Sequence, residues 1–128
     1  MNAYVVDSSA WVEYFSGSES GKKAANIIDD EKNKLFTTVI TLAELSSFFK
    51  RNNRDFEKAH TIILKNSKII LLNEGDAKEL GKLHAEAKIK NKKLSFADSF
   101  VLFVAKKYNA KIITKDLDFR NYKEVIFI

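Results

Sequence analysis

The sequence predicts an α/β fold in which helices cover both faces of a parallel sheet. Short β-branched runs alternate with longer helical patterns along the 128 residues, which is the order that builds βαβ units. Hydrophobic residues make up 45% of the chain, and ten residues are phenylalanine, so there is enough apolar material for a packed core. A chain of this length is expected to form a single domain over residues 1–128.

Five short runs of apolar and β-branched residues are the predicted strands, because each is bounded by polar or turn-forming residues. They are residues 4–6, 35–39, 69–72, 111–114 and 125–128. Between them, apolar residues recur at spacings of three and four, the period of a helix with one buried face. The first such helix contains Trp11 and Phe15 and stops near Gly17. The other five contain residues 24–28, 42–49, 56–63, 77–87 and 100–105.

No repeat, proline-rich linker or low-complexity tract divides the chain. The most distinctive connector is a basic stretch, expected between the fifth and sixth helices, that contains Lys88, Lys90, Lys92 and Lys93. It is either a solvated loop or a contact for RNA, because lysine pairs with backbone phosphates. The formal net charge of +5 is compatible with such a polyanionic partner.

Composition also bears on location. The chain has no cysteine, which excludes disulfides and thiolate metal sites and agrees with the cytosol. The amino terminus lacks the basic and apolar regions of a signal peptide, and no apolar stretch reaches membrane-spanning length. We therefore expect a cytoplasmic protein with no membrane partner.

Four acidic residues each lie beside an apolar segment, where a carboxylate is least expected. Asp7 ends the first predicted strand, and Asp116 closely follows the fourth. Glu44 and Asp98 each fall one turn inside an apolar helix. An ionised carboxylate next to a core is costly unless it is paired, hydrogen-bonded or bound to a metal. If the fold gathers all four, a hard divalent cation explains them, because such ions take oxygen ligands.

The expected topology brings the four acids to one place. Ligands of open parallel sheets bind at the carboxyl edge of the strands, and Asp7 and Asp116 lie just past two such strand ends. Glu44 is near the start of a helix that leaves the same edge. Asp98 reaches it as well if the fourth strand is parallel to the rest, because the sixth helix must then run back along the sheet.

Each acid also has a simpler explanation. Thr41 and Glu44 match the capping box, in which a hydroxyl is followed three residues later by an acid. Ser95 and Asp98 match it too. Asp7 could cap its own helix, and the fourth acid could be an ordinary turn residue. Capping and metal binding are compatible, because a cap fixes the backbone that aims the carboxylate.

Four segments contain the four acids, and they are residues 5–11 (VVDSSAW), 37–45 (TTVITLAEL), 94–98 (LSFAD) and 113–119 (ITKDLDF). They resemble the four motifs of PIN domains, in the same order and at the same spacing. The closest resemblance is to the small VapC-type toxins of toxin–antitoxin pairs, and it covers essentially the whole chain. One short motif would be weak evidence for the family, whereas four motifs in the right order and spacing are specific evidence.

This resemblance implies a three-layer α/β/α sandwich around a mainly parallel sheet of four to five strands. It also implies a ribonuclease that depends on Mg²⁺ or Mn²⁺, with an RNA substrate, a cognate antitoxin and a homodimeric state. Carried over motif by motif, the metal-binding and catalytic acids are Asp7, Glu44, Asp98 and Asp116. The accessory positions are Thr114, Asp118 and Ser8.

Hydrolysis of a phosphodiester agrees with such a site, because a divalent cation activates water and neutralises the developing charge. Neither histidine is expected to act as a base, since His60 and His84 are predicted away from the acidic edge, on the surface or packed. Trp11, Tyr14 and Phe15 could stack on RNA bases, but their helical spacing favours core packing or a partner interface.

The aromatic side chains of several small helices exceed what a thin α/β layer is expected to bury, which predicts a surface for a second copy or an antitoxin peptide. They are Trp11, Phe15, Phe48, Phe49 and Phe56. This expectation concerns the partner and not the acidic site.

Two other classes of protein also fit parts of the pattern. A phosphoacceptor receiver domain would need a second acid beside Asp7 and an aspartate at the end of the third strand, where the chain has Leu72 and Asn73. A catalytically silent PIN-like RNA-binding or scaffold domain would have lost one or more of the four acids, and none is lost here. We therefore expect a metal-dependent endoribonuclease, the toxin of a VapBC-type pair.

Overall fold

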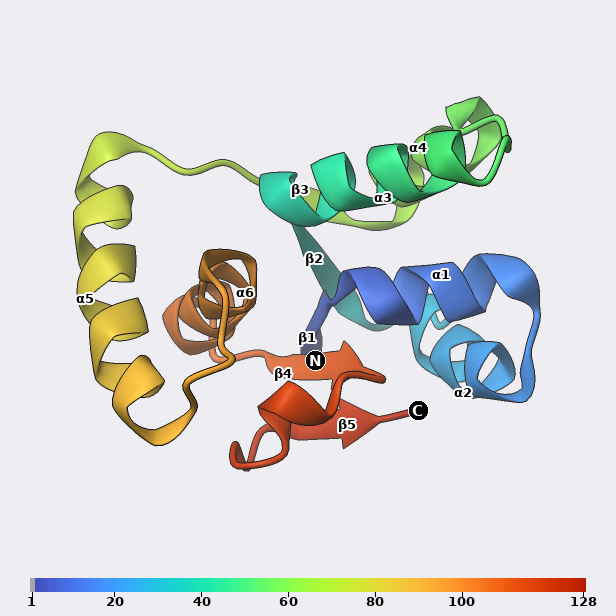
Figure 1. Cartoon of the computed structure of the whole chain (residues 1–128). Helices are drawn as coiled ribbons and strands as arrows, with labels where there is room; N and C mark the ends of the chain where they lie inside the picture. The colour runs from blue at the N-terminus through green and yellow to red at the C-terminus, as the bar shows by residue number, and fades with distance from the viewer. Residues whose placement is uncertain (1) are drawn as a thin grey trace.

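The structure, a computed structural model, describes residues 2–128, and within them the chain forms five strands and six α-helices (Figure 1). The strands are β1 (Ala3–Val6), β2 (Lys34–Thr38), β3 (Lys68–Ile70), β4 (Lys111–Thr114) and β5 (Val125–Phe127). The helices are α1 (Ser8–Ser16), α2 (Glu19–Ile28), α3 (Val39–Arg51), α4 (Glu57–Asn66), α5 (Glu74–Lys90) and α6 (Phe96–Lys107). A short 3-10 helix, η1 (Leu117–Phe119), follows β4.

All five strands form one sheet in the order β3-β2-β1-β4-β5, and every neighbouring pair is parallel. This confirms the prediction of an α/β fold with a parallel sheet. The chain moves outward from β1 through β2 to β3 and then crosses to β4, on the other side of β1. The strand order therefore reverses between β1 and β4, the position at which open α/β sheets bind ligands.

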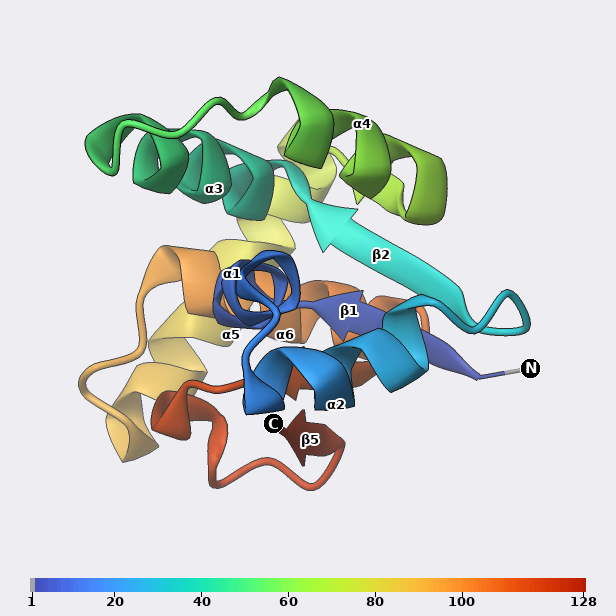
Figure 2. The same cartoon turned by 90° about the vertical axis from the view of Figure 1, so that its right-hand side faces the viewer.

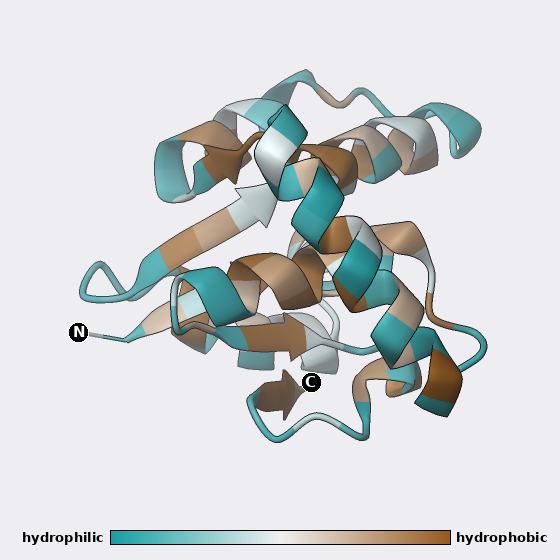
Figure 3. Ribbon diagram, turned by 90° about the vertical axis from the view of Figure 1, so that its left-hand side faces the viewer, coloured by the Kyte–Doolittle hydropathy of each residue, from teal (hydrophilic) through white to brown (hydrophobic). Residues whose placement is uncertain are grey.

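Alternate residues of the strands point to opposite faces of the sheet, and each face has its own core. Val5, Phe36 and Ile112 pack with residues of α5 and α6. Val6 and Ile113 pack on the other face with residues of α1, α2, α3 and α4. Figure 1 shows these two groups of helices on either side of the sheet, and Figure 3 shows apolar residues concentrated in the strands. The molecule is therefore the three-layer sandwich that the sequence predicts.

The first two helices pack side by side (Figure 2). As predicted, α1 ends at Gly17, whose φ of 68° lies in the left-handed region and whose N–H donates to the carbonyl oxygen of Glu13 at 3.1 Å. A Cβ atom at Gly21 would collide with the same carbonyl oxygen. Glycine is thus required at Gly17 by the turn and at Gly21 by the close approach of α2 to α1.

Several predicted boundaries were wrong. The third strand ends at Ile70 and not at Leu72, and the fifth ends at Phe127 and not at Ile128. Val39, expected to end the second strand, is the first residue of α3, because the Thr38 hydroxyl accepts the backbone N–H of Thr41 at 3.0 Å and caps the helix there. The basic stretch is only partly a connector, since α5 continues through Lys88 to Lys90. Lysine in the last turn of a helix is stabilised by the helix dipole, which favours this continuation.

The expectation of surplus aromatic surface was wrong for two residues. Trp11 and Phe49 are buried, with 0% and 4% of their surfaces exposed. Phe15 contacts both, with ring centroids 5.6 Å from Trp11 and 6.0 Å from Phe49. Phe56 packs against Phe49 at 5.2 Å. The helices thus bury these rings largely against one another. Within residues 2–128, no helix combines the length and the apolar character needed to cross a membrane.

Candidate functional site

Asp7 lies where the strand order reverses. It directly follows β1, and its backbone N–H donates to the carbonyl oxygen of Ile113 in β4 at 3.0 Å. It occupies the cap position of α1, but its side chain makes no capping hydrogen bond with that helix. Capping, the simpler explanation of this acid, therefore does not describe its carboxylate.

Two hydroxyl groups hold the carboxylate of Asp7. Its Oδ2 atom accepts hydrogen bonds from Thr114 Oγ1 at 2.7 Å and from Ser9 Oγ at 3.0 Å. Only 5% of Asp7 is exposed, and this burial is the main cause that raises the pKa of its carboxyl group. The two hydroxyls and the Ser8 backbone lower that pKa, while the negative charge of Asp98 raises it further. Asp7 is therefore a buried acid that is oriented by its neighbours, and it forms no ion pair with a cationic side chain of residues 2–128.

Three other acids form a compact group. One carboxylate oxygen each from Asp98, Asp116 and Asp118 can be chosen so that all lie within 4.8 Å of one another. Asp116 Oδ1 accepts the backbone N–H of Asp118 at 2.8 Å, which forms the turn into η1. Asn91 ties the same turn to the end of α5, because its Nδ2 donates to the carbonyl oxygen of Asp118 at 2.8 Å. The group is thus built on a backbone that is held from two sides.

Asp98 is a helix cap and is also a member of the acidic group. Ser95 and Asp98 form the capping box of α6, with each side chain accepting the other residue's backbone N–H at 3.0 and 3.2 Å. The pKa of the Asp98 carboxyl is nevertheless raised, first by desolvation and then by the charges of Asp116 and Asp118, against the opposing hydrogen bonds to Ser95. The cap fixes the turn from which this carboxylate reaches the acidic group.

Glu44 lies on α3, which begins at the same edge, and it retains access to solvent. The pKa of its carboxyl is raised by partial desolvation first, and next by the charges of Asp7 and Asp98. Among residues 2–128, the 4.8 Å group does not include Glu44 or Asp7. The Thr41 hydroxyl bonds with Thr38 and does not begin the helix, so the capping-box explanation of Glu44 was wrong.

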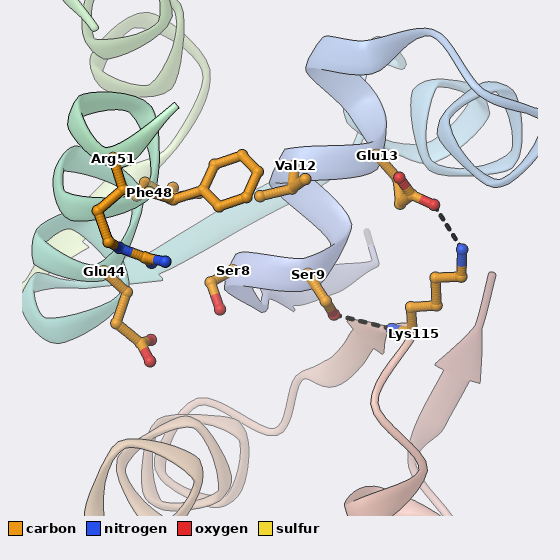
Figure 4. Close-up of a pocket in the computed structure, with 9 residues that line it drawn as sticks. Ser8, Ser9, Val12, Glu13, Glu44, Phe48, Arg51 and Lys115 are labelled. Carbon is orange, nitrogen blue, oxygen red and sulfur yellow. Dashed lines mark hydrogen bonds and ion pairs between the residues drawn. The ribbon is translucent and has the colours of Figure 1, made fainter. Parts of the chain in front are cut away.

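A cleft of about 420 Å³ lies between α1 and α3 and has Glu44 in its wall (Figure 4). Its lining residues are Ser8, Ser9, Val12, Glu13, Glu44, Leu45, Phe48, Arg51 and Lys115. Lys115 Nζ pairs with Glu13 Oε1 at 2.6 Å. The guanidinium of Arg51 extends toward Glu44 and Ser8 in Figure 4 and forms no ion pair within residues 2–128. Its Nε donates to Ser47 Oγ at 3.3 Å, and its guanidinium carbon lies 6.0 Å from the centre of the Phe48 ring. Arg51 thus places a positive charge in this cleft.

Several residues near the site were not singled out by the sequence. Ser9 bonds with Asp7 and also accepts the backbone N–H of Lys115 at 2.9 Å. Arg51 follows Glu44 by seven residues, which places both side chains on one face of α3. That spacing is the signal by which the sequence could have placed Arg51 near the site. His84 was expected on the surface or in a packing role, and its ring stacks on Phe96, two residues before Asp98, with ring centroids 3.9 Å apart. The sequence did not reveal this partner, because it depends on how the middle of α5 packs against the first turn of α6.

The remaining predicted positions lie as follows. The side chains of Lys88, Lys90, Lys92 and Lys93 are exposed and form no ion pair within residues 2–128. His60 stacks on Phe56 in the first turn of α4, with ring centroids 5.5 Å apart. The structure therefore leaves the four lysines open to solvent and His60 in a packing role.

The identity of the fold family follows from the sequence match to a family model described as "PIN domain", which spans residues 4–125. This chain belongs to the PIN-domain family. A comparison with curated protein sequences gave no match. The family match thus confirms the resemblance that the four motif segments indicated.

Solved structures similar to this PIN domain include components of toxin–antitoxin systems. A toxin–antitoxin complex from Klebsiella pneumoniae matches at 20% identity over 96% of this chain and 95% of that chain, with a TM-score of 0.69. VapBC2 from Rickettsia felis, crystallised on promoter DNA, matches at 19% identity over 98% and 97%, with a TM-score of 0.71. VapC20 from Mycobacterium tuberculosis, a toxin described as cleaving the sarcin–ricin loop, matches at 16% identity over 95% and 96%, with a TM-score of 0.71. These likenesses concern the fold.

Proposed function

We propose that this PIN domain is a divalent-metal-dependent endoribonuclease that hydrolyses RNA phosphodiester bonds. The observation that carries the proposal is the group of acids at the carboxyl edge of the sheet. Carboxylate oxygens of Asp98, Asp116 and Asp118 lie within 4.8 Å of one another. The negative charge of Asp98 also raises the pKa values of Asp7 and Glu44. We further propose that it is a cytoplasmic, single-domain toxin of a VapBC-type pair. The toxin–antitoxin structures that share its fold support this second step.

The donor set fits a hard divalent cation. Carboxylate oxygens from several segments are what Mg²⁺ and Mn²⁺ prefer, and clustered acids with raised pKa values are stabilised by a positive charge. The residues that would hold the ion, and carry catalysis, are Asp7, Glu44, Asp98 and Asp116, with Thr114, Asp118 and Ser8 as accessory residues. A bound Mg²⁺ or Mn²⁺ supplies a Lewis acid that lowers the pKa of the attacking water and offsets charge on the phosphate.

The chain's own residues position these ligands. Thr114 and Ser9 aim Oδ2 of Asp7, and the turn between Asp116 and Asp118 is closed by Oδ1 of Asp116, which accepts the backbone N–H of Asp118. Asp98 is fixed by its capping box. Such preorganisation lowers the cost of arranging charges during the reaction.

The proposed partners are an RNA substrate, a cognate antitoxin and a second copy of the chain. The basic stretch supports the first of these, because its exposed lysines precede the helix that carries Asp98. Phosphate contacts by Lys88, Lys90, Lys92 and Lys93 would raise affinity without reading sequence.

The decisive experiment is cleavage of RNA by the purified chain with Mg²⁺, with Mn²⁺ and with excess EDTA. We expect cleavage with either ion, none in EDTA, and losses of at least about 100-fold in rate for Asp7→Asn and Asp116→Asn, the scale seen when a catalytic group is removed. Glu31→Gln, an exposed acid in the loop before β2, is the matched control and should stay fully active.

Undiminished cleavage in excess EDTA would overturn the mechanism. RNA binding that is never followed by cleavage, with both ions and several RNAs, would favour a catalytically silent RNA-binding or scaffold domain. The toxin role is tested by inducing the chain in cells with and without the small protein encoded beside it. Growth arrest that this neighbour does not relieve would contradict that role.

A further inference from the structure

Phe96 is an aromatic residue with an unusual degree of exposure. It is the first residue of α6 and lies two residues before Asp98, yet 60% of its surface is open to solvent. Phenylalanine loses favourable burial at such a position. Scattered exposed hydrophobics are common on proteins, so exposure alone decides nothing.

The ring of Phe96 is also held in place. The imidazole of His84 stacks on it with ring centroids 3.9 Å apart and planes inclined by only 15°. His84 covers one face of the ring, so the exposed surface is on the other face and the edges. The capping box of Ser95 and Asp98 fixes the backbone on either side. An aromatic face that is ordered before binding loses little entropy when a second ring stacks on it.

The surroundings of Phe96 favour a nucleic acid over an apolar ligand. Asp98, a member of the acidic group, follows Phe96 by two residues in α6, and Lys92 and Lys93, both exposed, precede it in the connector. Aromatic rings next to cations are the combination with which proteins bind single-stranded nucleic acids. A duplex cannot use such a ring, because the faces of its paired bases are already covered.

We propose that Phe96 is a stacking platform for one unpaired RNA base next to the phosphate that the acids receive. This inference rests on the proposed ribonuclease function and narrows its substrate to RNA that is single-stranded at the site. His84 is the positioning residue, because it supports the buried face of the ring. The connector lysines then contact the backbone of the same strand.

The first test is RNA binding in EDTA, where cleavage does not occur and the result is independent of the ribonuclease proposal. A labelled single-stranded RNA should bind Phe96→Leu about 5- to 150-fold more weakly than wild type, the loss expected for one stacked base. Phe96→Tyr and Phe96→Trp should restore binding. Because no charge is removed, the dependence of affinity on salt should stay the same, unlike the effect of removing lysines.

A second test uses fluorescence. Trp11 is fully buried, so the tryptophan of Phe96→Trp would be the exposed reporter, and RNA should quench it. Leu64→Trp is the matched control, because Leu64 is also exposed, at 50%. It lies near the end of α4, which leads into the amino end of β3, whereas the acids lie at the carboxyl ends of the strands. Its emission should not change with RNA.

A scan of RNAs that each lack one base identifies the stacked position. Wild type should lose affinity at one position near the cleaved bond, and Phe96→Leu should lose none there. Equal binding by wild type and Phe96→Leu, together with an unquenched Phe96→Trp, would overturn the proposal. So would a Phe96→Leu variant that keeps RNA affinity and loses an antitoxin, since the ring would then belong to a protein interface.

Discussion

The hydroxyl of Thr114 lies 2.7 Å from Oδ2 of Asp7 and joins the carboxyl ends of β4 and β1. The same hydroxyl oxygen accepts the backbone N–H of Asp116 at 2.9 Å. One buried side chain thus links two acids that are more than a hundred residues apart in the sequence. Thr114 therefore orients the first acid and the turn that carries the second.

Replacing Thr114 with valine should destabilise the protein by about 1–3 kcal/mol, because a buried acceptor loses its donor. Thr114→Ser keeps the hydroxyl and is the control, with only the loss of a methyl group. Urea unfolding of the three proteins in EDTA measures the difference. A Thr114→Val protein as stable as Thr114→Ser would show that this hydrogen bond contributes little.

Replacing Asp118 with asparagine should raise the melting temperature in EDTA, because repulsion with Asp98 and Asp116 is relieved. The side chain of Asp118 forms no hydrogen bond within residues 2–128, so nothing else is lost. Saturating Mg²⁺ should stabilise wild type by about 2.7 kcal/mol at a hundredfold excess over Kd and the variant by less. Glu86→Gln, on the exposed side of α5, should respond to Mg²⁺ as wild type does. An unchanged response of Asp118→Asn would remove it from the site.

The corresponding change at Asp98 is less decisive. Asp98→Asn relieves repulsion but also removes the acidic member of the capping box, which costs about 0.3–1 kcal/mol at a helix N-terminus. The two effects oppose each other, so we expect a small change of melting temperature in EDTA. The loss of the Mg²⁺ response remains, and calorimetry of Mg²⁺ binding measures it directly. A full response would exclude this carboxylate as a ligand.

Without metal, stability should fall as pH rises above the ordinary pKa values of 3.8 for aspartate and 4.5 for glutamate. The pKa values of Asp7, Glu44 and Asp98 are raised in the folded state, so between the ordinary and raised values the folded chain binds more protons than the unfolded one. The free energy of unfolding then decreases with pH. Below the ordinary values all three acids are protonated in both states, and this destabilisation is absent.

Urea unfolding in EDTA over a series of pH values tests this sign. Asp7→Asn should make the fall in stability with pH shallower than in wild type, because one raised acid no longer titrates. Glu31→Gln, an exposed acid, should leave the slope unchanged. If stability fell more steeply with pH in Asp7→Asn than in wild type, burial would not raise the pKa of Asp7 in the folded state.

The basic stretch predicts a salt-dependent interaction with RNA. Replacing Lys88, Lys90, Lys92 and Lys93 with glutamine should flatten the slope of log affinity against log salt by about 0.7 for each phosphate that lysine no longer neutralises. The control replaces four exposed lysines elsewhere, which are Lys23, Lys32, Lys58 and Lys65. Equal slopes for both quadruple variants would show that the basic stretch is simply solvated.

Much of this architecture could be predicted because it depends on local pattern. The alternation of strand and helix, the stop at Gly17 and the placement of Asp7 and Asp116 after strands all follow from periodicity and turn chemistry. The capping box of Ser95 and Asp98 was readable for the same reason. Its counterpart at Thr41 failed because Thr38, three residues earlier, caps α3 more favourably. Two overlapping caps can be told apart only by the backbone.

Which side chains meet depended on the packing of distant segments. The residue pattern alone predicted that several carboxylates leave strands and helices at one edge of the sheet, since that depends on chain direction. It did not determine that Asp118 joins Asp98 and Asp116 within 4.8 Å, nor that His84 stacks on Phe96. Those contacts depend on how α5 and η1 pack against the first turn of α6, and packing between distant segments leaves no periodic signal in the residues that make it.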